Sequence, residues 1–79
     1  MNAYEALKAI LVEQLRVPPV VVTPDATKDD LDLDSLAVAE LVTILQEDRG
    51  LAVEESEIAG AETVQDIVDL MLAHEAAQP

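Results

Sequence analysis

The stretch that decides the fold is DSLAVAELVTILQED, residues 34–48. Its apolar side chains recur every three or four residues, a spacing that places them on one face of an α-helix. Gly50 follows, where a left-handed residue often ends a helix. The stretch predicts an amphipathic helix over 35–48 whose apolar face must be covered by other helices. That face consists of Val38, Leu41, Val42 and Leu45.

A first covering helix is predicted over residues 3–16. Asn2 and Glu5 resemble a capping pair at its start. Charged residues fall on the opposite side of the helical wheel, so the apolar arc is expected to be buried. This arc consists of Tyr4, Leu7, Ile10, Leu11 and Leu15.

A last helix is predicted to begin after Thr63, which can form a capping pair with Asp66. Between the second and last helices, residues 56–60 can make only a short helical turn that ends at Gly60. The predicted fold is all-α: a small bundle of three main helices plus one short helix. The apolar arc of the last helix consists of Val64, Ile67, Val68, Met71 and Leu72.

A long loop is predicted between the first and second helices, over about 18 residues. Pro18, Pro19 and Pro24 exclude a regular helix and a central strand there. Together the segments predict a single domain over residues 1–76, with 77–79 as a frayed tail. The loop's apolar residues, expected to hold it to the core, are Val20, Val21, Val22, Leu31 and Leu33.

Composition narrows the class of function. The 79 residues include 17 acids, 4 bases and no cysteine, for a net charge of −13. A chain of this size buries only ~60% of its unfolded surface, which leaves little room for an enclosed catalytic pocket. Leu, Ile and Val make up 25 of the residues, which favours folding over disorder. We expect a cytoplasmic monomer that binds basic protein surfaces, and neither nucleic acid nor membrane.

Ser35 is the candidate site because it stands at the start of the second helix. Serine at such a position is most often a cap. Asp34 can perform that capping instead, which would leave the Ser35 hydroxyl free where the helix dipole favours an anion. The nearby aspartates oppose a phosphate, so this position suits enzymatic attachment of a phosphodiester better than passive phosphate binding.

A second candidate feature is a stripe on the face of the same helix that points away from the core. Leu36 stands at its head, on the wrong side for a core leucine. A single exposed leucine usually has no function, but this one follows Ser35 and precedes two carboxylates. The pattern indicates a docking stripe that consists of Leu36, Glu40, Thr43 and Glu47.

A calcium loop is one alternative for the acidic run, because Asp30, Asp32 and Asp34 alternate as its first ligands would. The register fails, since Ser35 stands where glycine is wanted and Leu41 where glutamate is needed. We therefore expect no metal site.

A serine hydrolase is a second alternative. The only histidine, His74, stands near the end of the last helix, where it more often complements the negative end of the dipole. The sequence contains no G-x-S-x-G nucleophile elbow. We expect no catalytic residue and no enzyme activity.

At residues 30–36, DLDLDSL, the sequence resembles the acyl carrier proteins. The attachment motif of that family has a leucine, usually a glycine, an apolar residue and then Asp-Ser-Leu. The resemblance extends to Thr23-Pro24-Asp25, to Glu40-Leu41-Val42 and to Thr63-Val64-Gln65-Asp66, and so covers nearly the whole chain.

The resemblance implies that Ser35 receives 4'-phosphopantetheine from coenzyme A and that the thiol of this arm carries an acyl chain as a thioester. Asp34 would assist the phosphopantetheinyl transferase, with Leu36 completing the attachment motif, and the docking stripe would contact partners. Those partners would be an acyl-loading enzyme, a ketosynthase or an acyltransferase with a basic docking surface. The chain would thus be a non-catalytic carrier in fatty acid, polyketide or related specialised biosynthesis.

The sequence departs from the family pattern at five positions. Asp32 replaces the usual glycine, which is tolerable because Asp adopts a left-handed conformation more readily than most residues. Lys28 stands where an apolar or aromatic residue is common. These changes favour a dedicated pathway over a generic fatty acid synthase. The remaining departures are Ala37, Val38 and Arg49.

Two other functions remain open from the sequence. One is an aminoacyl or peptidyl carrier, although Leu33 and Asp34 before the serine favour acyl cargo. The other is an acidic protein-interaction module without a cofactor, which the charge and size fit equally well.

Overall fold

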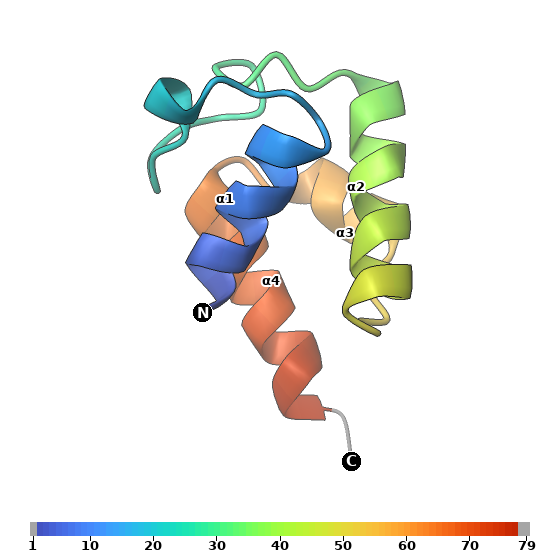
Figure 1. The fold of residues 1–79 in the computed structure, drawn as a ribbon. Helices are drawn as coiled ribbons and strands as arrows, with labels where there is room; N and C mark the ends of the chain where they lie inside the picture. The colour runs from blue at the N-terminus through green and yellow to red at the C-terminus, as the bar shows by residue number, and fades with distance from the viewer. Residues whose placement is uncertain (1, 78–79) are drawn as a thin grey trace.

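The computed structural model describes residues 2–77, which form an all-α bundle (Figure 1). This part of the chain contains no strand, only one isolated bridge between Thr27 and Thr63. The predicted fold class is therefore confirmed. The elements in chain order are α1 (Ala3–Glu13), the 3₁₀-helix η1 (Pro19–Val21), α2 (Ser35–Asp48), α3 (Glu55–Gly60) and α4 (Val64–Ala77).

Helix α1 begins as predicted but ends earlier. Asn2 caps its start, because Asn2 Oδ1 accepts a hydrogen bond from the Glu5 backbone N–H at 2.8 Å. The predicted end at residue 16 is wrong, because Arg16 is left-handed (φ 61°) and the Val17 N–H closes the helix onto the Leu11 carbonyl at 2.8 Å. Arg16 is not a glycine, so the sequence does not mark this left-handed position, although Pro18 two residues later shows that the helix must end nearby.

The long connection between α1 and α2 runs over one end of the bundle (Figure 1). It is less irregular than predicted, because the three residues of η1 form a 3₁₀ turn. Val22 and Leu31 are buried, and Val21 and Leu33 are partly buried, as expected. The expectation for Val20 is wrong: it is 84% exposed. Successive residues of a 3₁₀ turn point in different directions, so the three valines cannot all face the core.

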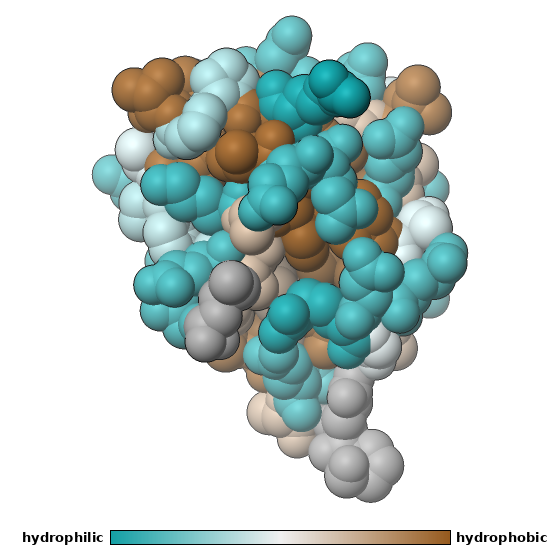
Figure 2. Space-filling model, in the orientation of Figure 1, coloured by the Kyte–Doolittle hydropathy of each residue, from teal (hydrophilic) through white to brown (hydrophobic). Residues whose placement is uncertain are grey.

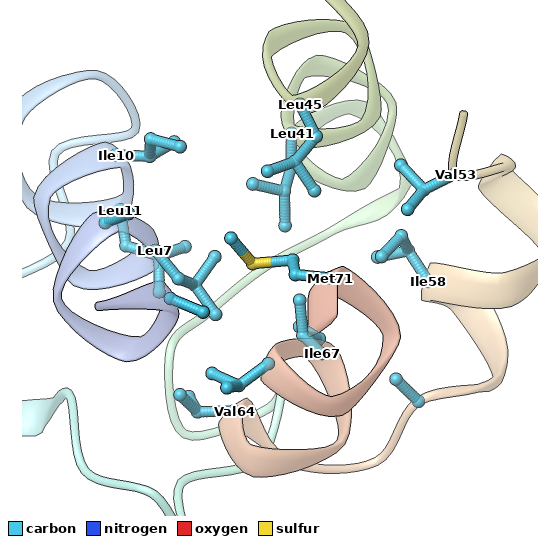
Figure 3. Packing of buried hydrophobic residues seen from close by; sticks show 14 of the residues in the cluster. Leu7, Ile10, Leu11, Leu41, Leu45, Val53, Ile58, Val64, Ile67 and Met71 are labelled. Atoms are coloured by element: carbon cyan, nitrogen blue, oxygen red, sulfur yellow. The ribbon is translucent and has the colours of Figure 1, made fainter. Parts of the chain in front are cut away.

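The core lies where α1, α2 and α4 meet. Figure 3 shows Met71 of α4 between the side chains of α1 and those of α2. All four residues of the predicted α2 face are buried. Leu72 is an exception to the prediction for α4, because it lies at the edge of the apolar arc and is 49% exposed. The side chains below 2% exposure include Leu7, Leu11, Leu41, Leu45, Ile58, Ile67 and Met71.

Backbone hydrogen bonds tie the long connection to the start of α4. The Val64 N–H donates to the Ala26 carbonyl at 2.9 Å, and the Gln65 N–H donates to the Pro24 carbonyl at 3.0 Å. These bonds satisfy N–H groups that a helix start otherwise leaves without partners. The connection is therefore anchored before it reaches Ser35.

The predicted cap of α4 is also present. The Asp66 N–H donates to Thr63 Oγ1, and the Thr63 N–H donates to Asp66 Oδ2, both at 3.2 Å. Helix α4 continues through Ala77, and residues 78 and 79 of the predicted tail lie outside the described residues. No helix within 2–77 is long and apolar enough to cross a membrane.

Candidate functional site

Asp34, and not Ser35, caps helix α2. Asp34 is extended (φ −87°, ψ −176°), and its Oδ1 accepts a hydrogen bond from the Ala37 N–H at 2.8 Å. Ser35 is exposed, and its hydroxyl makes no hydrogen bond to any described residue. The alternative in which Ser35 is the cap is therefore excluded, and its Oγ is free to react.

The helix start also offers unpaired backbone donors beside this hydroxyl. Asp34 takes the N–H of Ala37 with its side chain and the N–H of Val38 with its carbonyl, at 2.8 and 2.9 Å. The N–H groups of Ser35 and Leu36 have no acceptor among residues 2–77. They lie at the positive end of the helix dipole, which suits a phosphate attached to Ser35.

A capped turn positions Ser35 from the other side. The Thr27 backbone N–H donates to Asp30 Oδ2 at 3.0 Å, and the Asp30 backbone N–H donates to Thr27 Oγ1 at 3.1 Å. The turn closes with the Leu33 N–H on the Lys28 carbonyl at 2.9 Å, and Asp32 between them is left-handed (φ 56°). This bond pattern usually has glycine at the left-handed position. The prediction that Asp32 fills the role of that glycine is confirmed.

Two aspartates of the acidic segment before Ser35 accept hydrogen bonds from backbone N–H groups. Asp30 binds the Thr27 N–H, and Asp34 caps α2. Among the described residues, no three Asp, Glu, His or Cys side chains are grouped to hold a metal ion.

An open groove of about 540 Å³ lies next to Ser35, between the turn, the start of α2 and helix α3. Leu33, Val38 and Ala59 form its apolar part. Sequence reasoning did not find this groove, because its walls come from three segments that meet only in the folded chain. The polar residues that line it are Lys28, Asp29, Asp34, Ser35, Glu55 and Ser56.

The docking stripe lies on the outer face of α2, as its spacing predicted. Leu36 is 69% exposed, and Glu40, Thr43 and Glu47 are exposed. Figure 2 shows hydrophilic side chains over most of one face of the molecule, interrupted by separate hydrophobic patches in its upper half. A single exposed leucine among carboxylates gives an apolar contact point within an acidic surface.

Two residues that sequence reasoning missed lie beside the docking stripe. Gln14, just after α1, and Ile44 of α2 line an open depression of about 390 Å³ together with Glu40 and Thr43. Gln14 carried no signal because its place depends on how α1 packs against α2.

His74 lies in the last turns of α4, as predicted, but it also makes a contact that the sequence did not indicate. Its Nε2 lies 3.0 Å from Glu57 Oε1, so it joins α4 to α3. The backbone N–H of Glu54 and the His74 ring both lower the pKa of Glu57. This pair has a structural role and does not contact Ser35.

Comparisons with known proteins match this arrangement. Residues 5–71 match the sequence pattern of the family described as "Phosphopantetheine attachment site". The chain is 39% identical to the acyl carrier protein of Saccharopolyspora erythraea over 70 residues, which are 87% of this chain and 74% of that protein. It is 40% identical to the acyl carrier protein of Thermosynechococcus vestitus over 85% of this chain and 84% of that protein.

A third relative, the acyl carrier protein of Helicobacter hepaticus, is 39% identical over 86% of this chain and 91% of its own length. Fold and site thus define a phosphopantetheine-bearing carrier. The chain belongs to the acyl carrier protein family. Its prosthetic group is covalently attached 4'-phosphopantetheine, and members of the family are carriers that serve biosynthetic enzymes rather than catalysts.

The residues around the start of α2 fit this group. The hydroxyl of Ser35 is free, the N–H groups of Ser35 and Leu36 are unpaired, and the groove begins at the same residue. The arm supplies a terminal thiol, a group that the cysteine-free chain does not possess.

Proposed function

We propose that Ser35 is the residue that carries the phosphopantetheine arm. On it the protein would hold acyl intermediates as thioesters while the enzymes of fatty acid, polyketide or related specialised biosynthesis act on them. The observation that carries the proposal is the cap at α2. Because Asp34 satisfies the Ala37 N–H, the neighbouring Ser35 hydroxyl is exposed and unbonded.

The chemistry assigned to Ser35 is a single transfer. Its Oγ forms a bond to the phosphorus that bears the pantetheine in coenzyme A, and the phosphoanhydride bond of coenzyme A breaks. The adenosine bisphosphate leaves, and the Ser35 proton passes to a base of the phosphopantetheinyl transferase. Asp34 would assist that enzyme from the adjacent position.

The docking stripe supplies the second half of the proposal. Glu40 and Glu47 would attract a basic surface on the acyl-loading enzyme, ketosynthase or acyltransferase, and Leu36 would give it an apolar contact. All three are exposed, and Leu36 and Glu40 lie within two turns of Ser35. A partner bound there would therefore be close to the arm.

The test is enzymatic loading followed by intact mass. Wild-type protein, coenzyme A, Mg²⁺ and a broad-specificity phosphopantetheinyl transferase should yield protein heavier by one phosphopantetheine group. Ser35→Ala should stay unmodified. Ser56→Ala is the matched control, because Ser56 lines the same groove and is also exposed; it should be loaded like the wild type.

Two results would refute the proposal. If Ser35→Ala is still loaded, the arm is attached elsewhere. If the wild type stays unmodified while a control carrier is loaded, an acidic interaction module without a cofactor becomes the better interpretation of this chain.

The identity of a thioester isolated from the native host would separate acyl from aminoacyl or peptidyl cargo. The cytoplasmic and monomeric states stay predictions from composition.

A further inference from the structure

The connection between α1 and α2 contains the longest uncharged run of this acidic chain, VPPVVVTP at residues 17–24. Val20 in this run is 84% exposed, more than any other large apolar side chain within residues 2–77. Pro18, Pro19 and Pro24 are exposed as well. Because a contiguous apolar surface with a polar border is typical of an interaction site, this run gives the connection a contact surface.

The exposure of Val20 is built into a hydrogen-bonded turn. Val20 is the central residue of η1, which the Val22 N–H closes by donating to the Pro19 carbonyl at 3.2 Å. The Tyr4 hydroxyl of α1 donates to the Val22 carbonyl, also at 3.2 Å. Proline at the first position of η1 restricts the backbone further, because its ring fixes φ. A partner that contacts Val20 therefore has little of the chain to order on binding.

An open depression of about 360 Å³, the Val20 depression, lies beside this turn. Its apolar part consists of Val20, Val21 and Ala26, and its carboxylates belong to Asp25 and Asp30. Asp30 already accepts a backbone N–H, whereas the Asp25 carboxylate has no hydrogen-bond partner within residues 2–77. Apolar contacts next to a carboxylate suit lysine or arginine, because the aliphatic stem packs while the charged group pairs with the acid.

A second copy of this chain is a poor occupant of the Val20 depression. Two chains of net charge −13 repel each other. The chain has only four bases, and two of them are engaged within it. Lys28 donates to the carbonyls of Ile58 and Ala59, and Arg49 lies 3.4 Å from Glu75. The depression therefore fits a basic surface of another protein.

The Val20 depression and Ser35 lie on two sides of the same turn. Asp30 lines the depression, and its neighbour Asp29 lines the groove at Ser35. Figure 1 shows η1 and the start of α2 at the same end of the bundle. An enzyme that modifies the Ser35 hydroxyl must cover this end, whereas an enzyme that acts on the thiol works at the far end of the arm. The modifying enzyme is therefore the partner whose surface reaches the depression.

We propose that Val20 and Asp25 form a second contact site for the phosphopantetheinyl transferase, in addition to the docking stripe. A lysine or arginine of the transferase enters the Val20 depression, with its stem against Val20 and its charged group at Asp25. This inference rests on the proposed attachment of the arm to Ser35. It gives two residues of the connection a role in recognition by that enzyme, and enzymes that act on the thioester do not use them.

Binding to the unmodified protein tests the contact without any transfer. The broad-specificity transferase is titrated with the protein in the absence of coenzyme A, and Kd is measured by calorimetry. Val20→Ser with Asp25→Asn should raise Kd about fivefold, because an apolar contact and an ion pair are lost. Both side chains are exposed, so the circular dichroism spectrum should not change. If Val20→Ser alters it, Val20→Thr takes its place, because threonine keeps the branched shape.

The matched control makes the same kinds of change on α4. Leu72→Ser with Asp69→Asn removes one exposed apolar side chain and one exposed charge, and it should bind like the wild type. Salt separates the two contributions to the contact. At roughly 1 M salt, where the screening length is about 3 Å, Asp25→Asn alone should bind like the wild type, whereas Val20→Ser should still bind more weakly.

Loading and acylation kinetics identify the partner. In the loading reaction the double variant Val20→Ser with Asp25→Asn should raise KM for the carrier about fivefold and leave kcat unchanged, because neither residue lines the groove at Ser35. Once loaded, the double variant should be acylated by an acyl-loading enzyme at the rate of the loaded wild type.

The other outcomes overturn the contact. An unchanged Kd in the double variant does so, and so does equal weakening in the α4 control. Slower acylation with normal loading assigns the depression to a different enzyme, and a dimer in ultracentrifugation that Val20→Ser abolishes assigns it to a second copy. A wild type that binds the transferase with this dependence on Val20 but is not loaded keeps the contact and refutes the attachment to Ser35.

Discussion

Asp34 Oδ1 lies 2.8 Å from the Ala37 backbone nitrogen, so the residue before Ser35 caps the helix that Ser35 begins. This one contact links the stability of α2 with the proposed role of Ser35, because it both starts α2 and leaves the serine hydroxyl unbonded. Substitutions of Asp34 can separate its contribution to helix stability from its proposed assistance to the transferase.

Asp34→Ala should lower the free energy of unfolding by about 1 kcal/mol, because it removes the side-chain cap. Asp34→Asn should lose less, because asparagine caps equally well and only the interaction of the charge with the dipole is lost. Urea denaturation measures both. If the carboxylate assists the transferase, Asp34→Asn should be loaded more slowly in spite of its near-native stability; equal loss of stability in both variants would contradict the cap.

Residues other than glycine that adopt the left-handed conformation should be sites of backbone strain. Arg16 (φ 61°) and Asp32 (φ 56°) are the two positive-φ residues other than glycine in the described range. Arg16→Gly and Asp32→Gly should each raise the free energy of unfolding by up to about 1 kcal/mol, because glycine adopts this conformation without a steric cost.

The two substitutions change the net charge in opposite directions. A higher free energy of unfolding in both variants would therefore come from relief of backbone strain and not from charge. Gly50→Ala is the reverse control: Gly50 has φ 66°, and no atom lies within 4 Å of an added Cβ. It should lower stability through the backbone alone. A rise in only one of the two glycine variants would show that charge dominates.

Stability should depend on pH through Glu57. The Glu54 N–H, first, and then His74 hold the pKa of Glu57 below its ordinary value of 4.5. Because the folded pKa is the lower one, this stabilisation is complete above about pH 4.5 and is lost as the pH falls through the folded pKa. Urea midpoints of wild type and Glu57→Gln should therefore converge below that pH. A constant difference between them down to pH 3 would contradict the assignment.

Charge reversal of the docking stripe should weaken partner recognition. Glu40→Lys with Glu47→Lys should slow acylation by a partner enzyme and flatten its salt dependence, because the attraction to a basic surface is lost. Helicity measured by circular dichroism should change little, since both side chains are exposed. Glu62→Lys with Asp69→Lys changes the net charge equally at exposed positions before and on α4, and should leave the rate closer to that of the wild type. Equal slowing in this control would assign the effect to net charge alone.

Local patterns in the sequence were sufficient for much of the fold and for the candidate site. Several predicted features depend on contacts between residues within one or two helical turns of one another. They are the buried face of α2, its bounds, the exposed stripe and the cap at Thr63. Side chains at these spacings meet in any helix, whatever surrounds it. The turn around Asp32 is similarly local, since its bonds span five residues or fewer.

The tertiary structure alone decided which polar groups meet across the bundle. Three contacts join residues that are 17 or more positions apart in the sequence. They are the contact of Lys28 with the end of α3, the contact of His74 with Glu57, and the bonds of the loop carbonyls to the start of α4. Polar side chains at such distances have no periodic signal, because their partners depend on how the helices pack. The sequence by itself therefore determined the helices and marked Ser35, whereas packing decided the groove beside Ser35 and the lysine that forms its wall.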